Sequence, residues 1–115
     1  MNSTKIDRVN AELARKIAEI INYGMKDVRI KGMVSVLRVD TTKDLKQAKV
    51  YLSILGDDAR ETFEGIKSGT GFIKSRLAGT LNIRQIPDLI FILDDSIEYG
   101  IKIGKIIEEI HNNEK

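Results

Sequence analysis

The stretch KSGTGFIKSR, residues 67–76, places two glycines between two segments whose apolar residues recur at helical spacing. Such spacing predicts helices, and closely placed glycines predict a break between them. The sequence therefore predicts two helices joined by an interhelical kink of Gly69, Thr70 and Gly71. The apolar residues concerned are Ala59, Phe63 and Ile66 before the kink, and Phe72, Ile73, Leu77 and Leu81 after it.

The rest of the chain predicts a sheet that these helices can cover. An apolar stripe predicts a helix over residues 5–23, with Gly24 as its stop. Alternation predicts strands over residues 33–40 and 47–55, close enough to pair as an antiparallel hairpin. A continuous apolar run, residues 89–93, predicts a strand covered on both faces, and residues 97–110 predict a final helix. Without an internal repeat or linker, we expect one α+β domain over residues 1–115, with a three-stranded sheet.

Particular residues predict where the elements begin and which faces they bury. Thr4 with Asp7, and Asp95 with Glu98, resemble capping pairs at helix starts. The pair Asp57-Asp58 suits the positive end of a helix dipole. Alternation places Met33, Ser35, Leu37 and Val39 on one face of the first strand, and Ala48, Val50, Leu52 and Ile54 on one face of the second.

The composition is that of a soluble globular domain, with 42% hydrophobic and 31% charged residues. The absence of cysteine excludes disulfides, a thiol nucleophile and cysteine metal sites, and it fits a reducing cytoplasm. The longest apolar run, Leu89–Leu93, is far too short to cross a membrane, and the opening MNSTKIDRVN lacks the apolar core of a secretory signal. We therefore expect a cytoplasmic protein without membrane contact.

The net charge of +2 conceals an uneven distribution along the chain. Residues 1–50 have a balance of +5, residues 51–115 have a balance of −3, and residues 65–87 contain no acidic residue. One interpretation is a set of solvated surface charges, and the other is a patch for an anionic partner. The basic residues of the acid-free segment are Lys67, Lys74, Arg76 and Arg84.

The sequence lacks the common catalytic and metal-binding patterns. Lys74-Ser75 follows glycines, but a phosphate-binding P-loop requires glycine where Ser68 and Ile73 stand, and it follows a strand instead of a helix. The only histidine, His111, is almost at the C-terminus, offers no zinc pair and is near no candidate nucleophile. We therefore predict a binding protein with no catalytic residue, no metal site and no cofactor.

A glycine-containing break between two helices beside a sheet is also the arrangement of KH domains, in which a GxxG loop clamps the nucleic-acid backbone. Here the spacing of Gly69 and Gly71 is GxG, one residue shorter than in that clamp. Glycines allow another backbone to approach closely, and a helix N-terminus favours anions. They can also serve only to turn the chain, and the local sequence leaves both interpretations open.

Several stretches in the same order resemble the ribosome-binding factor A family over nearly the whole chain. They are Arg8-Val9 with Glu12, Asp27-x-Arg29, TKDLxxAKVY at residues 42–51, and GFIKSRLAGTLNIRQIPDLIFILDDSIEYGIKI at residues 71–103. The resemblance implies a type II KH-like fold of the order helix, strand, strand, helix, kink, helix, strand. In the family the kink has the pattern Ala-x-Gly, so Gly69 replaces the usual alanine, and we expect a looser kink.

The resemblance also implies a function. It implies a non-catalytic assembly factor that binds the small (30S) ribosomal subunit and its 16S rRNA, is monomeric when free, and is released with the GTPase RsgA. It further implies a role in late maturation of that RNA, including its 5′ region, and in growth in the cold. Many relatives carry a denser basic run after the kinked helix, where only Arg84 keeps its charge here, so we expect fewer phosphate contacts from this segment.

We predict that RNA is recognised by its shape and phosphates, because only 5% of residues are aromatic and the basic residues are dispersed. We expect Phe72 in the core instead of against a base. One alternative is a general KH-like RNA chaperone or regulator that acts on free RNA, and another is a protein-interaction module. The predicted RNA contacts are Lys67, Lys74, Arg76 and Arg84 around the kink, with Arg8, Lys26, Arg29 and Lys31 as second choices.

Overall fold

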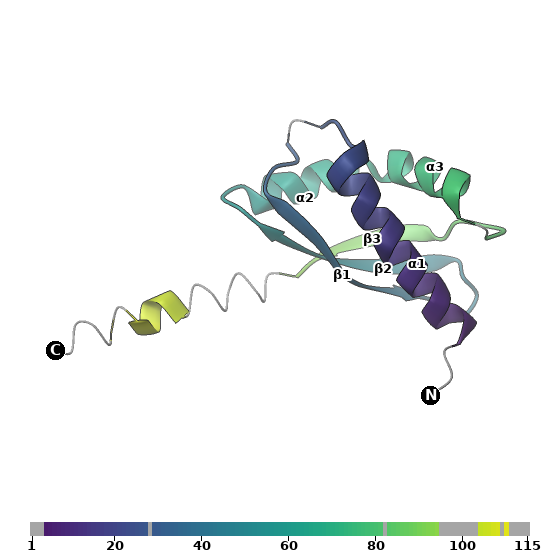
Figure 1. Cartoon of the computed structure of the whole chain (residues 1–115), viewed down its shortest axis with the longest axis horizontal. Coiled ribbons are helices and arrows are strands. Elements are labelled where there is room, and N and C mark those ends of the chain that lie inside the picture. Colours follow the sequence, from purple (N-terminus) through teal and green to yellow (C-terminus); the bar gives the residue numbers. More distant parts are fainter. Residues whose placement is uncertain (1–3, 28, 82, 95–103, 109, 111–115) are drawn as a thin grey trace.

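The structure, a computed structural model, describes residues 4–27, 29–81, 83–94, 104–108 and 110. The described elements follow the predicted order of helix, strand, strand, helix, kink, helix and strand (Figure 1). They are α1 (Lys5–Glu19), the π-helix η1 (Ile20–Gly24), β1 (Met33–Thr41), β2 (Gln47–Leu55), α2 (Ala59–Ser68), α3 (Thr70–Thr80) and β3 (Asp88–Leu93).

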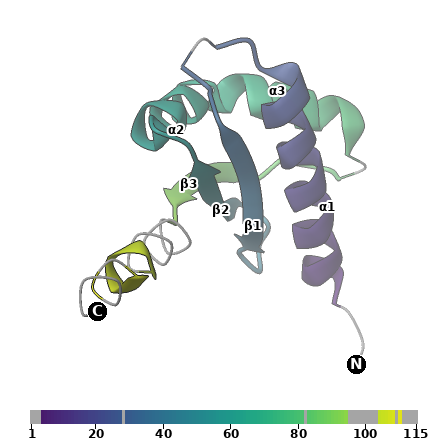
Figure 2. The same cartoon turned by 60° about the vertical axis from the view of Figure 1, so that its left-hand side comes forward.

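The three strands form one mixed sheet in the order β1-β2-β3. β1 and β2 pair as the predicted antiparallel hairpin, with Val34 opposite Ile54. β3 pairs in parallel with β2, with Phe91 beside Val50. A parallel partner requires a crossover connection, which α2 and α3 supply. Helices α1, α2 and α3 lie on one face of the sheet (Figure 2), so the α+β domain has two layers.

The core lies between the helices and the inner face of the sheet. Alternate residues of β2 are almost completely buried there, which confirms the predicted face of Ala48, Val50, Leu52 and Ile54. The helices contribute Leu13, Ile17, Ile66, Ile73 and Leu77, none of which has exposed surface. Burial of this apolar surface is the main force that holds the kinked helix pair on the sheet.

The first helix begins at the predicted capping pair. The backbone N–H of Asp7 donates to the Thr4 hydroxyl oxygen at 3.0 Å, and the Thr4 N–H donates to the Asp7 carboxylate at 3.2 Å. The predicted helix over residues 5–23 corresponds to α1 together with the wider turn η1. In η1, the Asn22 side chain donates to the carbonyl of Val34 at 3.2 Å, which fixes the end of the helix to β1.

The alternation predicted for β1 is wrong beyond its middle. A β-bulge lies between Val36 and Arg38, so the strand changes phase there. As a result, Val34 and Val39 are both buried although they are separated by an odd number of positions. Leu37, predicted on the same face as Val39, is exposed instead.

The expectation that β3 is covered on both faces is also wrong. Leu89 and Phe91 are buried against the helices, but Ile90, which points to the other face, is 39% exposed. A continuous apolar run does not reveal how many layers cover a strand, and the helices α1, α2 and α3 cover only one face here. The outer face of β3 is consequently accessible.

Two further details concern helix starts. Asp58 occupies the N-cap position of α2, at the positive end of the helix dipole as predicted, but its side chain makes no capping hydrogen bond. Gly104 to Glu108 and Ile110 are helical, in agreement with part of the predicted final helix, and are exposed. The rest of that prediction, with the Asp95–Glu98 pair and His111, lies outside the described residues.

None of the helices in the described ranges has the length and apolar character that a membrane crossing needs.

Candidate nucleic-acid interface

The kink lies where the helical hydrogen bonds of α2 end and those of α3 begin. The Gly69 N–H donates to the Gly65 carbonyl at 3.1 Å, and the Ile73 N–H donates to the Gly69 carbonyl at 3.0 Å. The Thr70 hydroxyl donates to the Lys67 carbonyl at 2.6 Å. The kink therefore consists of two helix ends that share Gly69 as their boundary residue.

The two glycines of the kink differ in what their surroundings require. Gly69 has φ −91° and ψ 13°, a conformation that other residues also adopt. A β-carbon on Gly69 would nevertheless collide with the terminal methyl of Met25. A β-carbon on Gly71 would meet nothing within 4 Å. Gly69 thus permits a close approach of Met25, whereas no contact requires glycine at position 71.

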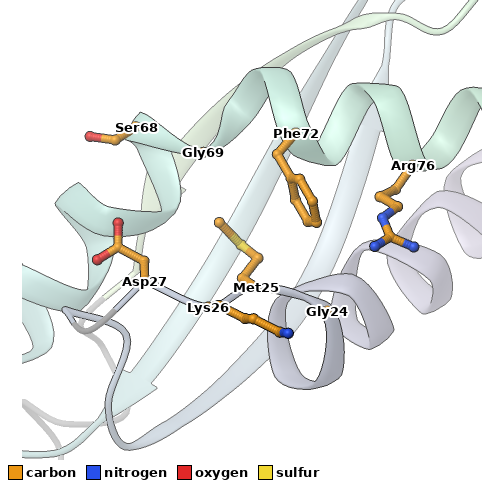
Figure 3. Close-up of a pocket in the computed structure, with 8 residues that line it drawn as sticks. All are labelled: Gly24, Met25, Lys26, Asp27, Ser68, Gly69, Phe72 and Arg76. Atoms are coloured by element: carbon orange, nitrogen blue, oxygen red, sulfur yellow. The ribbon is translucent and has the colours of Figure 1, made fainter.

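A hollow of about 480 Å³ lies between the kink and the segment that follows η1. Figure 3 shows the side chains of Met25 and Phe72 in its middle, with Asp27 and Ser68 towards one end and Arg76 towards the other. We call it the kink pocket. The side chains that line it are Met25, Lys26, Asp27, Ser68, Phe72 and Arg76.

The expectation that Phe72 belongs to the core is wrong. Its side chain lines the kink pocket and is 40% exposed. Ile73 and Leu77, one turn apart, face the core, and the position before Ile73 points about 100° away around the helix. Arg76, one turn after Phe72, has its guanidinium carbon 5.1 Å from the centre of the Phe72 ring.

Two predicted RNA contacts from distant parts of the chain meet in the kink pocket. Lys26 comes from the segment after η1, and Arg76 comes from α3. Both side chains are exposed, and neither forms a salt bridge within the described ranges. The pocket therefore combines an apolar middle with two unpaired positive charges.

Lys74, another predicted contact, lies elsewhere. Its ammonium group donates to the Asp88 carboxylate at 2.7 Å, at the start of β3. Residues two positions apart on a helix point in nearly opposite directions, so Lys74 and Arg76 lie on different sides of α3. The basic residues predicted around the kink therefore do not form one continuous patch.

Lys67 and Arg84 occupy two further places. Lys67 lies 3.8 Å from the Glu64 carboxylate and 5.3 Å from the centre of the Phe63 ring. Arg84 lines a second hollow of about 620 Å³ together with Lys5 and Asp44, beside the turn between β1 and β2. Lys5 was not among the predicted contacts, because its proximity to Arg84 results from the fold.

The remaining predicted RNA contacts, Arg29, Arg8 and Lys31, differ in whether their charges are already paired. The Arg29 guanidinium donates twice to the Asp27 carboxylate, at 2.7 and 3.1 Å. These hydrogen bonds, with one from the Arg29 backbone, lower the pKa of Asp27 to about 2. Arg8 and Lys31 are exposed on α1 and before β1, and neither forms a salt bridge within the part of the chain that the structure describes.

The hollows at the kink and beside Arg84 offer cationic, polar and apolar groups that can bind a ligand. Within the described ranges, no three His, Asp or Glu side chains gather closely enough to hold a metal ion. The pocket side chains that were not among the predicted site residues are Met25, Asp27, Ser68 and Phe72, which meet only through the fold. Helical spacing from Ile73 and Leu77 carried a signal for the exposure of Phe72.

These features define a small α+β domain in which a kinked pair of helices covers a mixed three-stranded sheet and presents exposed positive charges at the kink. The chain belongs to the ribosome-binding factor A family, whose sequence profile matches residues 5–107. The resemblance inferred from the ordered stretches is thereby confirmed.

Individual relatives match over nearly the full chain. Ribosome-binding factor A of Lachnospira eligens is 45% identical and aligns over 97% of this chain and 89% of its own length. Ribosome-binding factor A of Staphylococcus epidermidis is 44% identical, and both chains are covered completely.

Solved structures share the fold. The crystal structure of ribosome-binding factor A from Thermus thermophilus has a TM-score of 0.68 at 23% identity, over 76% of this chain and 93% of that one. A homology model of the Thermus thermophilus factor, fitted into a cryo-electron microscopy map of a complex of that factor with the 30S subunit, has a TM-score of 0.64 at 23% identity, over 75% of this chain and 91% of that one.

Proposed function

We propose that this protein is a non-catalytic assembly factor that binds the small (30S) ribosomal subunit through its 16S rRNA. Membership of the ribosome-binding factor A family along residues 5–107 is the observation that carries the proposal. A Thermus thermophilus protein with this fold has been fitted into a map of a 30S complex, which supports the choice of the small subunit.

The RNA would be held mainly through its phosphates. Lys26 and Arg76 in the kink pocket, and Lys5 and Arg84 in the second hollow, are the cationic side chains that these hollows present. Cations that neutralise phosphates release counterions, so binding of this kind weakens as salt is added. Lys67, Lys74 and Arg29 are further proposed contacts, each of which would have to loosen an existing salt bridge.

The finer points of the function follow from the family resemblance. In this proposal the protein acts in the cytoplasm, as a monomer when free, during late maturation of 16S rRNA and its 5′ region. It supports growth in the cold, and the GTPase RsgA takes part in its release. A general KH-like RNA chaperone that acts on free RNA is the second candidate, favoured by the exposed cations Lys26 and Arg76 at the kink pocket.

Fractionation of a cell extract on a sucrose gradient tests the proposal. An assembly factor is expected to co-sediment with free small subunits, and to be scarce on complete ribosomes. A chaperone of free RNA would stay in lighter fractions and lose that position after ribonuclease treatment. A protein that remains at the top of the gradient with or without ribonuclease would contradict both functions.

The contacts are tested by replacing Lys26, Arg76 and Arg84 with Ala in one variant. Log affinity for small subunits decreases linearly with the logarithm of the salt concentration. If each of the three residues contacts a phosphate, this slope becomes shallower by about 2 to 3 in the variant. The matched control replaces Arg60, Lys49 and Lys105 with Ala. These residues are exposed but outside both hollows, so the control loses the same three positive charges as the test variant. Equal slopes in the two variants would remove the three residues from the interface.

A further inference from the structure

We infer that the kink pocket is a binding site for a single unpaired nucleotide of RNA, with its base on Phe72 and its phosphate between Lys26 and Arg76. The inference rests on the proposed RNA-binding function and deepens it. It adds one defined ligand, and a stacking contact, to an interface expected from composition to recognise the shape and the phosphates of RNA.

The size and the lining of the pocket suit a nucleotide. Its volume of about 480 Å³ lies within the range of roughly 300–1,000 Å³ that small-molecule sites usually have. Phe72 presents a 40% exposed ring to it, and the Met25 side chain lies alongside (Figure 3). Aromatic rings beside cations are the arrangement with which proteins hold single-stranded nucleic acid, since every base has a π-face.

Arg76 prepares the ring for this role. Its guanidinium carbon lies 5.1 Å from the ring centre, so the cation restricts the motion of Phe72. The ring itself is 40% exposed, so part of its surface is open to a base. The same guanidinium has donors left to reach a phosphate oxygen, because it forms no salt bridge within the described ranges.

The charges of the pocket favour an anionic ligand. Lys26 and Arg76 are exposed and unpaired within the described ranges, while the Asp27 carboxylate is held by Arg29 at 2.7 Å. An apolar side chain of a protein partner would leave these two cations without a counter-charge, whereas a nucleotide supplies a phosphate. At the other end of the pocket, Ser68 and Asp27 offer polar atoms to a base edge (Figure 3).

The second hollow lacks these properties. It is lined by Lys5, Asp44, Leu45, Ile83, Arg84 and Gln85, and it includes no aromatic ring. Phosphate contact is possible there, but a base has nothing to stack on. The inference is therefore confined to the kink pocket.

The methyl group of Met25 allows a direct test in the full chain, which contains three methionines. In this test, the methionine methyl groups would be labelled with carbon-13, and the protein would be titrated with short oligo(A) and oligo(U) in a nuclear magnetic resonance experiment. A base in the kink pocket is expected to shift the Met25 methyl signal through its ring current. Met33, which lies on β1 outside the pocket, serves as the internal reference.

Two pairs of variants extend the test. Phe72→Leu keeps an apolar side chain but removes the ring, and should weaken oligonucleotide binding about 10-fold, a typical loss for one stacked base. Tyr23→Leu removes a ring that is 89% exposed and outside the pocket, and should leave affinity unchanged. Gly69→Ala should push Met25 into the pocket and weaken binding several-fold, whereas Gly71→Ala, which faces open space, should not.

The outcomes separate this inference from the proposed function. If the protein binds small subunits but the oligonucleotides leave the Met25 signal in place, or Phe72→Leu binds as tightly as the parent, the inference is overturned and the function stands. If Phe72→Leu loses affinity for subunits although Met25 never responds to RNA, the pocket holds a protein side chain and the inference is again overturned. A parent protein that binds neither subunits nor RNA contradicts the proposed function itself.

Discussion

The terminal methyl of Met25 lies in the space that a β-carbon on Gly69 would need. The two residues come from different elements, one after η1 and the other between α2 and α3. Their contact closes the kink pocket on one side, so the glycine at the kink is a packing residue as well as a boundary between helices. Met25 therefore explains sterically why glycine suits position 69.

This contact predicts a coupling between the two residues. Gly69→Ala should change the free energy of unfolding by no more than about 0.5 kcal/mol, because the gain in helix propensity is offset by displacement of a flexible side chain. In a Met25→Ala background the obstacle is absent, and Gly69→Ala should stabilise by about 0.4–1 kcal/mol. Urea denaturation of the four proteins measures the coupling, and strictly additive changes would contradict the contact.

Among the glycines that the structure describes, Gly32 is the one whose replacement should cost most stability. Its φ is +81°, which side-chain-bearing residues rarely adopt, and a β-carbon there would collide with the backbone carbonyl oxygen of Leu55. Since a backbone atom cannot move aside as a side chain can, Gly32→Ala should destabilise the protein by about 2 kcal/mol or more. Gly79→Ala, where a β-carbon meets nothing within 4 Å, is the matched control and should not destabilise. Thermal denaturation compares the two.

Thr62 should be a second sensitive position. Its side chain is fully buried, and its hydroxyl oxygen accepts from the Lys31 N–H at 3.1 Å. The hydroxyl also lies within hydrogen-bond distance of the carbonyls of Arg29 and Lys31, at 3.1 and 3.0 Å, and so fixes the segment before β1 to α2. Thr62→Val keeps the shape but leaves these groups unsatisfied, and should cost about 1–3 kcal/mol in urea denaturation.

A matched variant isolates burial as the cause. Thr80→Val removes a hydroxyl that is exposed near the end of α3, where it bonds to the Arg76 carbonyl at 3.2 Å. Water can replace that hydrogen bond, so the change in free energy should stay within about 0.5 kcal/mol. Similar losses in both variants would show that the hydroxyl of Thr62 does not hold the segment.

Periodicity predicted those parts of the fold in which local pattern and packing agree. The apolar face of β2 is one example, because an unbroken strand places every second residue on the core. The bulge in β1 was not predictable, because one extra residue between Val36 and Arg38 depends on how the two strands pair. The exposure of Ile90 depends on which face of the sheet the helices cover, and a single strand contains no such information.

The site was predicted less completely than the fold, since its parts meet only in three dimensions. Charge counting chose Lys26 and Arg76, but only the fold brings them to one pocket. The distribution of charge also predicted Lys74 as a contact, but it did not predict the salt bridge with Asp88, fourteen positions further along the chain. A basic residue in a sequence is a candidate contact, and its pairing in the structure decides whether its charge is available.

The Asp27–Arg29 pair predicts how stability depends on pH. The hydrogen bonds from Arg29 lower the pKa of Asp27 from its ordinary value of 3.8 to about 2. A carboxylate whose pKa is lower in the folded state binds fewer protons there than in the unfolded state. The charge of Asp27 therefore stabilises the fold at pH values above its ordinary pKa of 3.8. This stabilisation is lost as the pH falls through its folded-state pKa of about 2.

Asp27→Asn should accordingly be less stable than the parent near neutral pH. The difference in the free energy of unfolding should begin to shrink as the pH falls below 3.8, and should be mostly gone at about 2. Urea denaturation of both proteins across this range measures the convergence, and Asp57→Asn, which removes an exposed carboxylate without a salt bridge in the described ranges, serves as the control. A difference that stays constant down to the lowest pH would mean that the charge of Asp27 does not stabilise this wall of the kink pocket.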